Sequence, residues 1–316
     1  MLRAPEQAIV WPKPPDPPRV RYIGALTSSE DLHPAKSFGE VLDELISGPI
    51  PPSPLVKPHA VAVHSGGERV AVADTDAACV HVFDLAGHQY TRIESGGSAG
   101  QRLECPTGVG WDGDTLWIAD ARLHTAVVVA PNGAGRLVGT DTLQRPAGLA
   151  CCPADGLIYI SDAGSHAVVV FNRQGEFVRQ FGTQGGEPGQ FNFPAQIACG
   201  SDGTLVVADA MNFRVQRLRP DGTPINVFGQ KGDATGDFGL PKGVAVDAHG
   251  NIWVVDANFE NVQAFSPEGQ LLMVLGSEGH DPGEFWLPAG TFIDARQRMW
   301  IADTYNRRVQ VFELLP

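Results

Sequence analysis

The chain has 316 residues, of which 43% are hydrophobic and 19% are charged, and this composition excludes a disordered protein. Its net charge of −13 argues against a nucleic-acid partner, because phosphate backbones are repelled by such a chain. The 37 glycines and 25 prolines, both above their usual frequency, predict many turns, and no apolar run is long enough to span a bilayer.

The N-terminal region has no apolar segment of the kind found in a signal peptide, because Arg3, Pro5 and Glu6 interrupt it. We therefore expect a cytoplasmic protein, or an envelope or secreted one if the natural N-terminus carries a signal. Residues 1–18 are interpreted as a Pro-rich N-terminal segment in extended conformation.

The five cysteines are odd in number and show no CxxC spacing, so they support neither a disulfide framework nor a zinc ribbon. Cys151 and Cys199 align with Val246, at a strand position that favours a small apolar residue, and we expect core cysteines there and no redox pair. Cys152 aligns with Asp247 and is expected to be partly exposed, with its reactivity left open.

One pattern recurs six times along the chain: an apolar strand that ends in aspartate, a short polar loop, and a second apolar strand. Successive copies lie 42 to 47 residues apart, which is enough for four short strands with their turns. Because four-stranded sheets repeated around an axis form a propeller, the sequence predicts an all-β fold with six four-stranded antiparallel blades. The repeated aspartates are Asp74, Asp120, Asp162, Asp209, Asp256 and Asp303.

The last repeat holds only three strands, and the N-terminal region supplies a fourth. Residues 19–26, RVRYIGAL, resemble the fourth strands of other repeats, so we expect them to complete blade six and close the ring. The propeller domain then covers residues 19–316, with the blades at about 55–316. Between the closing strand and blade one, a capping box at 37–40 and helical spacing of apolar residues predict one short helix at about 38–47.

The segments GQFNFPAQIACGSDGTLVVADAMNFRVQRL (189–218) and GEFWLPAGTFIDARQRMWIADTYNRRVQVF (283–312) resemble NHL repeats. The resemblance covers about residues 55–316 and is strongest after residue 180. The Pro-rich opening is also similar to that of bacterial NHL propellers, in which such a segment often follows a secretion or lipoprotein signal. By analogy with this family, we expect a noncatalytic interaction module or scaffold that binds a protein or peptide.

The repeated aspartates belong to a loop whose fuller form is DxxNxRV, as at Asp209, Asn212 and Arg214. Aspartate and asparagine bond nearby backbone N–H groups in turns, and arginine pairs with carboxylates. A residue that recurs in every blade is more readily structural than catalytic, so we assign all six aspartates a structural role.

The loops that enter strand one and those that join strands two and three lie at the same end of the ring, which we call the channel-mouth face. Polar residues that enter the inner strands and mixed aromatic, Met and Arg side chains in the other loops suit a binding surface. The candidate ligand- or partner-binding residues are His59, Gln196, Lys242, Arg122, Met211, Phe213, Phe259, Tyr305 and Arg307.

An enzyme is the alternative interpretation, with a lactonase- or lyase-like propeller acting on a small molecule at the channel mouth. NHL-like propellers similar to the peptidyl-hydroxyglycine amidating lyases hold zinc through channel histidines that follow a proline, and only His59 matches that pattern. Because zinc sites need three or four ligands, we expect no metal and no cofactor. No nucleophile motif is present, so catalytic residues stay unassigned.

Overall fold

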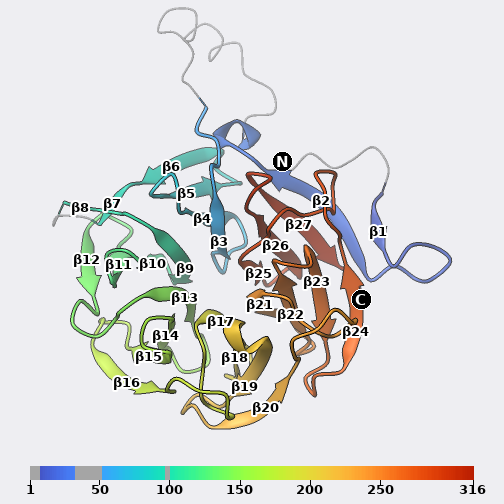
Figure 1. Cartoon of the computed structure of the whole chain (residues 1–316). Helices are drawn as coiled ribbons and strands as arrows, with labels where there is room; N and C mark the ends of the chain where they lie inside the picture. Colours follow the sequence, from blue (N-terminus) through green and yellow to red (C-terminus); the bar gives the residue numbers. More distant parts are fainter. Residues whose placement is uncertain (1–7, 33–51, 97–99) are drawn as a thin grey trace, which may run out of the picture.

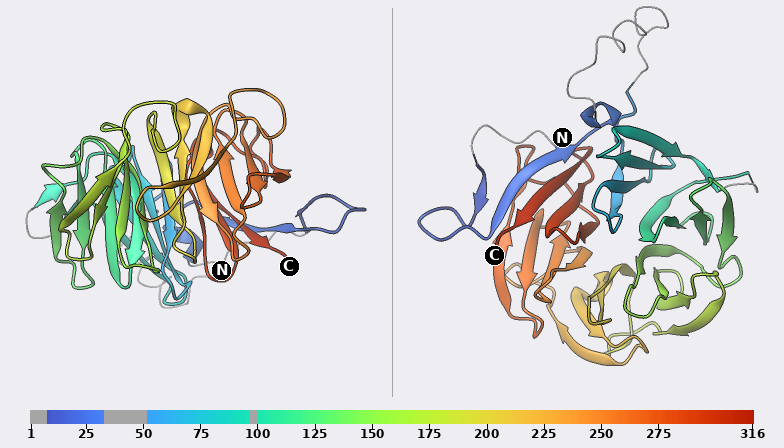
Figure 2. Two further views of the ribbon diagram at one scale, coloured as in Figure 1. Left: turned by 90° about the horizontal axis from the view of Figure 1, so that it is seen from below. Right: turned by 180° about the vertical axis from the view of Figure 1, so that it is seen from behind.

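The computed structural model describes residues 8–32, 52–96 and 100–316. Six antiparallel sheets stand around a central axis and form a closed ring, which confirms the predicted six-bladed propeller (Figure 1). Edge-on, the ring is a disc with loops at both ends (Figure 2). The helix predicted at about 38–47 lies outside the described residues. Within the described ranges, no helix is long and apolar enough to cross a membrane.

The strands follow the sequence repeats closely. Blades one and two contain β3 (Pro58–Val63), β4 (Arg69–Asp74), β5 (Cys79–Asp84) and β6 (Gln89–Ile93), then β9 (Pro106–Asp112), β10 (Thr115–Asp120), β11 (Thr125–Val129) and β12 (Gly135–Val138). Blades three and four contain β13 (Pro146–Cys151), β14 (Ile158–Asp162), β15 (Ala167–Phe171) and β16 (Phe177–Phe181), then β17 (Pro194–Cys199), β18 (Leu205–Asp209), β19 (Arg214–Leu218) and β20 (Pro224–Phe228).

Blade five contains β21 (Pro241–Val246), β22 (Ile252–Asp256), β23 (Asn261–Phe265) and β24 (Leu271–Leu275), and blade six contains β25 (Thr291–Ile293), β26 (Arg298–Asp303), β27 (Arg308–Leu314) and β2 (Val20–Leu26). A short strand β1 (Val10–Trp11) pairs with β2, and a small hairpin of β7 (Ser95–Gly96) and β8 (Gln101–Arg102) separates blades one and two. Single turns of 3-10 helix occur at Ser29–Leu32 and Ala210–Asn212.

The hydrophobic core lies between the blades. Each of the six interfaces has its own cluster of buried apolar side chains. Middle strands such as β14 and β15 are buried along their whole length, which explains their continuous apolar sequences, whereas the outer strand β16 is largely exposed. Buried Phe191 packs so closely on Gly182 that a Cβ there would lie 2.5 Å from the ring, and the same glycine has a φ of +91°.

The N-terminal strand closes the ring. β2 pairs with β27 in antiparallel register from Val20 opposite Leu314 to Leu26 opposite Val309, which confirms the predicted closing strand. Val20 belongs to the core between blades five and six, and Leu26 belongs to the core between blades six and one. The strand therefore contributes to two interfaces as well as completing a sheet.

The cysteine expectations were wrong for Cys152, which was expected to be partly exposed, and for the absence of a disulfide, while Cys151 and Cys199 are half-buried where core positions were expected. Cys152 is buried at 2% exposure and forms a disulfide with Cys199, which joins blade three to blade four within their shared core. Alignment within single repeats could not indicate this bond, because the two residues come from different strand positions of neighbouring blades. Cys79, Cys105 and Cys151 are free thiols.

Candidate functional site

The loops of the channel-mouth face are fixed by the six repeated aspartates, all of which are fully buried. In blade five, Asp256 accepts hydrogen bonds from the backbone N–H groups of Gly239 and Leu240 in the entering loop, at 2.7 and 3.0 Å. It also accepts bonds from Asn258 and Phe259 in the loop between strands two and three. One carboxylate therefore ties together the two loops that each blade contributes to the mouth.

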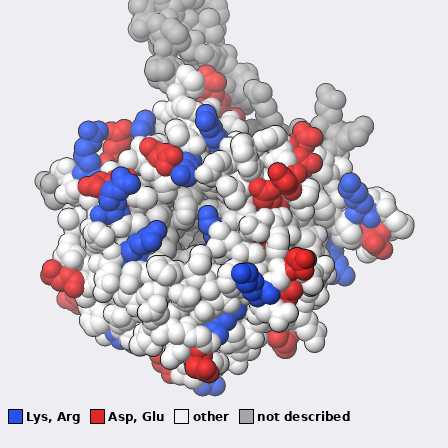
Figure 3. Space-filling view, in the orientation of Figure 1, with Lys and Arg blue, Asp and Glu red and all other residues white. Residues whose placement is uncertain are grey.

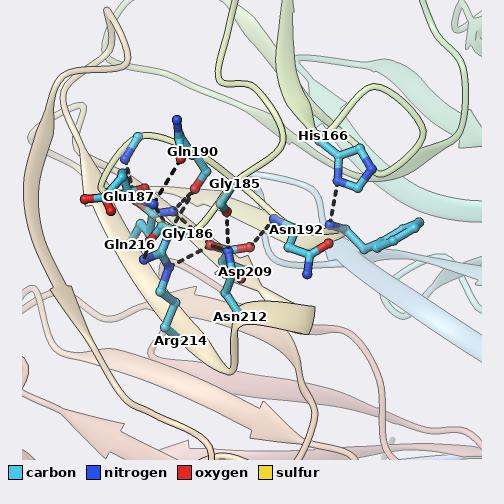
Figure 4. Close-up of polar contacts among 12 residues, drawn as sticks. His166, Gly185, Gly186, Glu187, Gln190, Asn192, Asp209, Asn212, Arg214 and Gln216 are labelled. Carbon is cyan, nitrogen blue, oxygen red and sulfur yellow. Dashed lines mark hydrogen bonds and ion pairs between the residues drawn. The ribbon is translucent and has the colours of Figure 1, made fainter.

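Blade four shows the fullest version of this anchor (Figure 4). Asp209 accepts hydrogen bonds from Asn212 Nδ2 at 2.9 Å and from Gln216 Nε2 at 3.0 Å, and it forms an ion pair with Arg214 at 2.7 Å. The Arg214 guanidinium continues to the carbonyl oxygens of Glu187 and Gln190 in the entering loop. Asp303, Asn306, Arg308 and Gln310 repeat the arrangement in blade six.

A cavity of about 490 Å³ opens at the mouth of the central channel, within the size range of small-ligand sites. Its lining includes His59, Gln196, Lys242 and Met211 of the predicted set, together with many Ala, Gly and Pro residues. The acidic residues Asp and Glu do not occur among its lining residues. In Figure 3 a basic side chain is visible inside the central hollow, with other basic groups around it, although the whole chain is acidic.

The cavity wall includes the second and third residues of the inner segments that begin at Pro58, Pro106, Pro146, Pro194 and Pro288, and the second residue, Lys242, of the segment that begins at Pro241. Small residues predominate there because neighbouring blades approach closely. A Cβ on Gly243, for example, would lie 2.4 Å from the Ala289 carbonyl oxygen. His59 and Lys242 are therefore large polar side chains in a ring made mostly of alanine and glycine.

Gln196 stands where blades two, three, five and six have glycine. Its Nε2 donates to the Thr291 carbonyl oxygen at 2.9 Å, and its Oε1 accepts from the Val244 and Thr291 N–H groups at 3.1 Å each. The amide is thus occupied by backbone groups of blades five and six. Gln196 lines the cavity, and its hydrogen bonds hold the ring together.

The His59 ring is fixed by the neighbouring blade. Its Nδ1 donates a hydrogen bond to the Thr107 carbonyl oxygen at 2.9 Å, which leaves Nε2 as an acceptor in the neutral tautomer. Burial and, secondarily, the positive charge of Lys242 lower the pKa of His59 to about 4. The imidazole is therefore uncharged at neutral pH.

Lys242 is the basic group deepest in the mouth, and its ammonium makes no hydrogen bond or ion pair with any residue that the structure describes. Burial, reinforced by the nearby charge of Lys57, lowers the pKa of Lys242 below its usual value. Lys57 itself pairs with Asp76 at 3.4 Å. A half-buried cation without a counter-ion is unfavourable, and an anionic ligand would relieve this cost.

The predicted rim residues divide into two groups. Arg122, Met211, Tyr305 and Arg307 are exposed, whereas Phe213 and Phe259 are half-buried. Phe213 packs against the core between blades four and five, and the Lys231 ammonium lies 5.2 Å from its ring centroid. These two phenylalanines therefore offer less free surface than sequence reasoning assumed.

Three rim residues were missed by the sequence analysis: Phe193 and Trp286, which are each 41% exposed, and Arg145. Trp286 lies against Tyr305, with ring centroids 5.4 Å apart, and Phe193 and Arg145 line the cavity. All three sit in the loops that precede the inner strands. The loops of Phe193 and Trp286 also carry a buried phenylalanine, Phe191 or Phe285, and the large residue that follows it within two positions was the available signal. The loop of Arg145 has no phenylalanine and offered no such signal.

No group of three or more His, Cys, Asp or Glu side chains that could hold a metal ion occurs in the described ranges. His81 is an example of a histidine whose two ring nitrogens already have protein partners. Its Nδ1 contacts the Tyr90 hydroxyl at 2.7 Å, and its Nε2 lies 3.5 Å from Asp74. That cluster is almost completely buried and stands where blades four to six have glutamine. It is thus a variant of the aspartate anchor.

The closed ring of six four-stranded antiparallel blades, with a cavity at one end of its channel, defines a six-bladed β-propeller. The family model for the NHL repeat matches residues 143–171, which contain the three strands β13, β14 and β15 of blade three. No curated protein sequence matches the chain significantly.

Solved structures share the fold at low sequence identity. A streptogramin B lyase is 12% identical with a TM-score of 0.60, covering 82% of this chain and 94% of its own. A catalytically inactive virginiamycin B lyase from Staphylococcus aureus with quinupristin is 14% identical with a TM-score of 0.60, covering 83% and 96%. An auxiliary nutrient binding protein from Bacteroides thetaiotaomicron is 12% identical with a TM-score of 0.65, covering 82% and 70%. At these identities the likeness extends to the fold alone.

Proposed function

We propose that this protein is a noncatalytic binding propeller that captures a protein or peptide partner on its channel-mouth face. The observation that carries the proposal is the combination of the cavity with exposed apolar side chains at its edge. Met211 and Tyr305 are 43% and 47% exposed, and Phe193 and Trp286 contribute similar surfaces. Aromatic and Met anchors around a pocket are typical of interface centres.

The rigidity of the face supports the same function. Buried aspartates fix the loops, and interblade bonds such as Thr304 Oγ1 to the Pro58 carbonyl oxygen (2.8 Å) and Thr107 Oγ1 to the Pro146 carbonyl oxygen (2.9 Å) fix the wall. A surface that is already ordered loses little conformational entropy when a partner binds.

The proposal is tested by comparing two triple variants in affinity capture from the native host, followed by calorimetry with the purified partner. The face variant carries Met211→Ala, Trp286→Ala and Tyr305→Ala. The matched control carries Phe177→Ala, Ile225→Ala and Leu272→Ala, which remove equally exposed apolar side chains from the outer strands of the ring. We expect the face variant to bind the partner at least about tenfold more weakly and the control to bind normally. Equal binding by both variants would refute the assignment of the face.

An enzyme acting on a small molecule at the same mouth is the second candidate, and His59 is the observation that favours it. Its Nδ1 is fixed by Thr107, and its Nε2 can accept a hydrogen bond from a substrate hydroxyl or water, so it can orient a reactant even though a pKa of about 4 makes it a weak base. A turnover screen with small cyclic esters and lactams tests this candidate, because any activity that depends on the cavity should disappear in His59→Ala while the fold is retained.

A further inference from the structure

The chemistry of the cavity indicates what kind of group it can accept. Its only Lys or Arg residues are Arg145 and Lys242, and it has no carboxylate to neutralise them. Because the Lys242 ammonium has no partner among the described residues, a ligand with one negative charge would complete its interactions. Because no Asp or Glu lies among the described lining residues, no carboxylate of the cavity would repel such a ligand.

His59, the second polar group of the cavity, favours a hydrogen-bond donor on the ligand, next to the negative charge that Lys242 would bind. His59 is neutral and its Nδ1 is committed to Thr107, so the remaining ring nitrogen can only accept. An ammonium group beside Lys242 would be repelled, whereas an amide N–H carries no charge. The two side chains together therefore suit an anion with an amide N–H nearby.

The remaining wall is apolar and determines what accompanies the charge. It is built from small residues such as Ala147, Ala195 and Ala289, with Leu240 and Met211 toward the rim. A medium-sized apolar side chain would be buried there, and transferring each of its methylene groups from water contributes about 0.8 kcal/mol. A phosphate or a second charge would find neither a second unpaired cation at depth nor a cluster of N–H donors.

We propose that the channel mouth binds the C-terminal end of a polypeptide, with the terminal carboxylate on Lys242 and an apolar terminal side chain in the cavity. This inference rests on the proposed function, because it assigns the chemistry of the partner at that same face. The amide N–H of the last residue lies close to its carboxylate in any peptide, which matches the acceptor that His59 presents. Preceding residues of the peptide then leave across Phe193, Met211 and the rest of the exposed rim. Capture of a chain end by its carboxylate is an established mode of peptide recognition.

The experiment uses the full chain and two pools of short fluorescent peptides that end in Leu, Val or Phe, one with free carboxylates and one with the same sequences amidated. Peptides enriched from the free-acid pool are measured by fluorescence anisotropy as both acid and amide. We expect the amide to bind about tenfold or more weakly, and Lys242→Met to remove that difference. Lys13→Met, in the exposed segment beside β1, is the matched control and should bind as the native protein does.

The thermal stability of Lys242→Met provides a second test. Because it removes an unpaired half-buried cation, the variant should unfold at the same or a higher temperature than the native protein. A marked loss of stability would mean that Lys242 has a structural partner in solution, and would overturn the proposal on its own.

The outcomes separate this inference from the proposed function. Acid and amide peptides that bind equally well, or binding that is unchanged in Lys242→Met, would overturn the carboxylate assignment and leave a peptide-binding face. Failure of every peptide in both pools would count against the two proposals together. If N-acetyl-leucine binds in a Lys242-dependent manner while no peptide does, the site takes small carboxylates and the peptide proposal is wrong.

Discussion

Gln196 on blade four is bonded to Thr291 on blade six, 95 residues later, through Nε2 to the carbonyl oxygen at 2.9 Å and Oε1 to the N–H at 3.1 Å. A single side chain thus reaches beyond the adjacent blade five, where it also accepts a hydrogen bond from Val244 N–H, to blade six. Most propeller contacts join adjacent blades, so this bond makes two distant blades directly dependent on each other.

Replacing Gln196 with alanine should destabilise the whole ring. The change leaves the Val244 N–H and both backbone groups of Thr291 without a partner, and a buried unsatisfied polar group costs about 1–3 kcal/mol. Chemical denaturation measures the loss. Gln174→Ala, at an exposed turn, should stay within about 0.5 kcal/mol of the native protein. Equal stability of the two variants would show that the crossing bonds contribute nothing.

Removal of residues 1–27 should abolish the cooperative stability of the propeller, because β27 loses its outer partner and two interfaces lose core residues. A milder test is Leu26→Ala, which should cost about 2–5 kcal/mol because the side chain is fully buried. The melting temperature in thermal unfolding measures the effect of both changes, the truncation and Leu26→Ala. An unchanged transition in the truncated chain would refute closure of the ring by β2.

Asp209→Asn should cost about 3–5 kcal/mol, since it removes the carboxylate, fully buried, that pairs with the largely buried Arg214 guanidinium. The control is Asp233→Asn, the same substitution at an exposed aspartate in the segment between β20 and β21, and it should have little effect on stability. Urea denaturation distinguishes them. Comparable values for the two variants would argue against the aspartate as the anchor of the mouth loops.

The depressed pKa of His59 predicts a pH dependence of stability. The unfolded imidazole titrates near 6.5 and the folded one at about 4, so between these values the unfolded chain binds the additional proton. Stability is therefore highest above pH 6.5 for this group, and it falls as the pH is lowered toward 4. His59→Asn keeps an N–H donor for Thr107 but does not titrate.

The measurement compares melting temperatures of native protein and His59→Asn from pH 7 to pH 4. We expect a steeper fall for the native protein over this window. Parallel curves would mean that His59 titrates normally. A histidine signal that titrates near pH 4 by NMR, and that is missing from the variant, would assign the effect to His59.

The disulfide between blades three and four predicts a thiol count. Alkylation under denaturing, non-reducing conditions should modify Cys79, Cys105 and Cys151, and prior reduction should add Cys152 and Cys199. Mass spectrometry of the peptides measures this directly. Alkylation of all five residues without reduction would show that the bond is absent from the purified protein.

Sequence reasoning predicted the blade number, the strand order and the closing strand because each is encoded locally and repeated. The aspartate that ends strand two, the turn glycines and the apolar strands recur in register, so an error in one copy is corrected by the others. RVRYIGAL could be assigned to blade six because that blade lacked one strand.

The site was less predictable because its properties arise between blades. The occupation of the Gln196 amide, the neutrality of His59 and the isolation of Lys242 all depend on residues from other repeats. The same applies to Cys152 and Cys199. Phe213 shows the opposite error, since a loop position suggested exposure whereas packing across the next interface half-buries it.

The pairing of β2 with β27 also sets the order in which the molecule can be completed during synthesis. β2 is synthesised before every strand of blades one to five and β27 after them, and Arg21 and Glu313, which are bonded across the seam, differ by 292 in residue number. Until β27 has been synthesised, the nascent chain therefore carries β2 without this partner and an incomplete blade six. Closure therefore waits for β27, and a product truncated before this strand keeps both edges open to association with other chains.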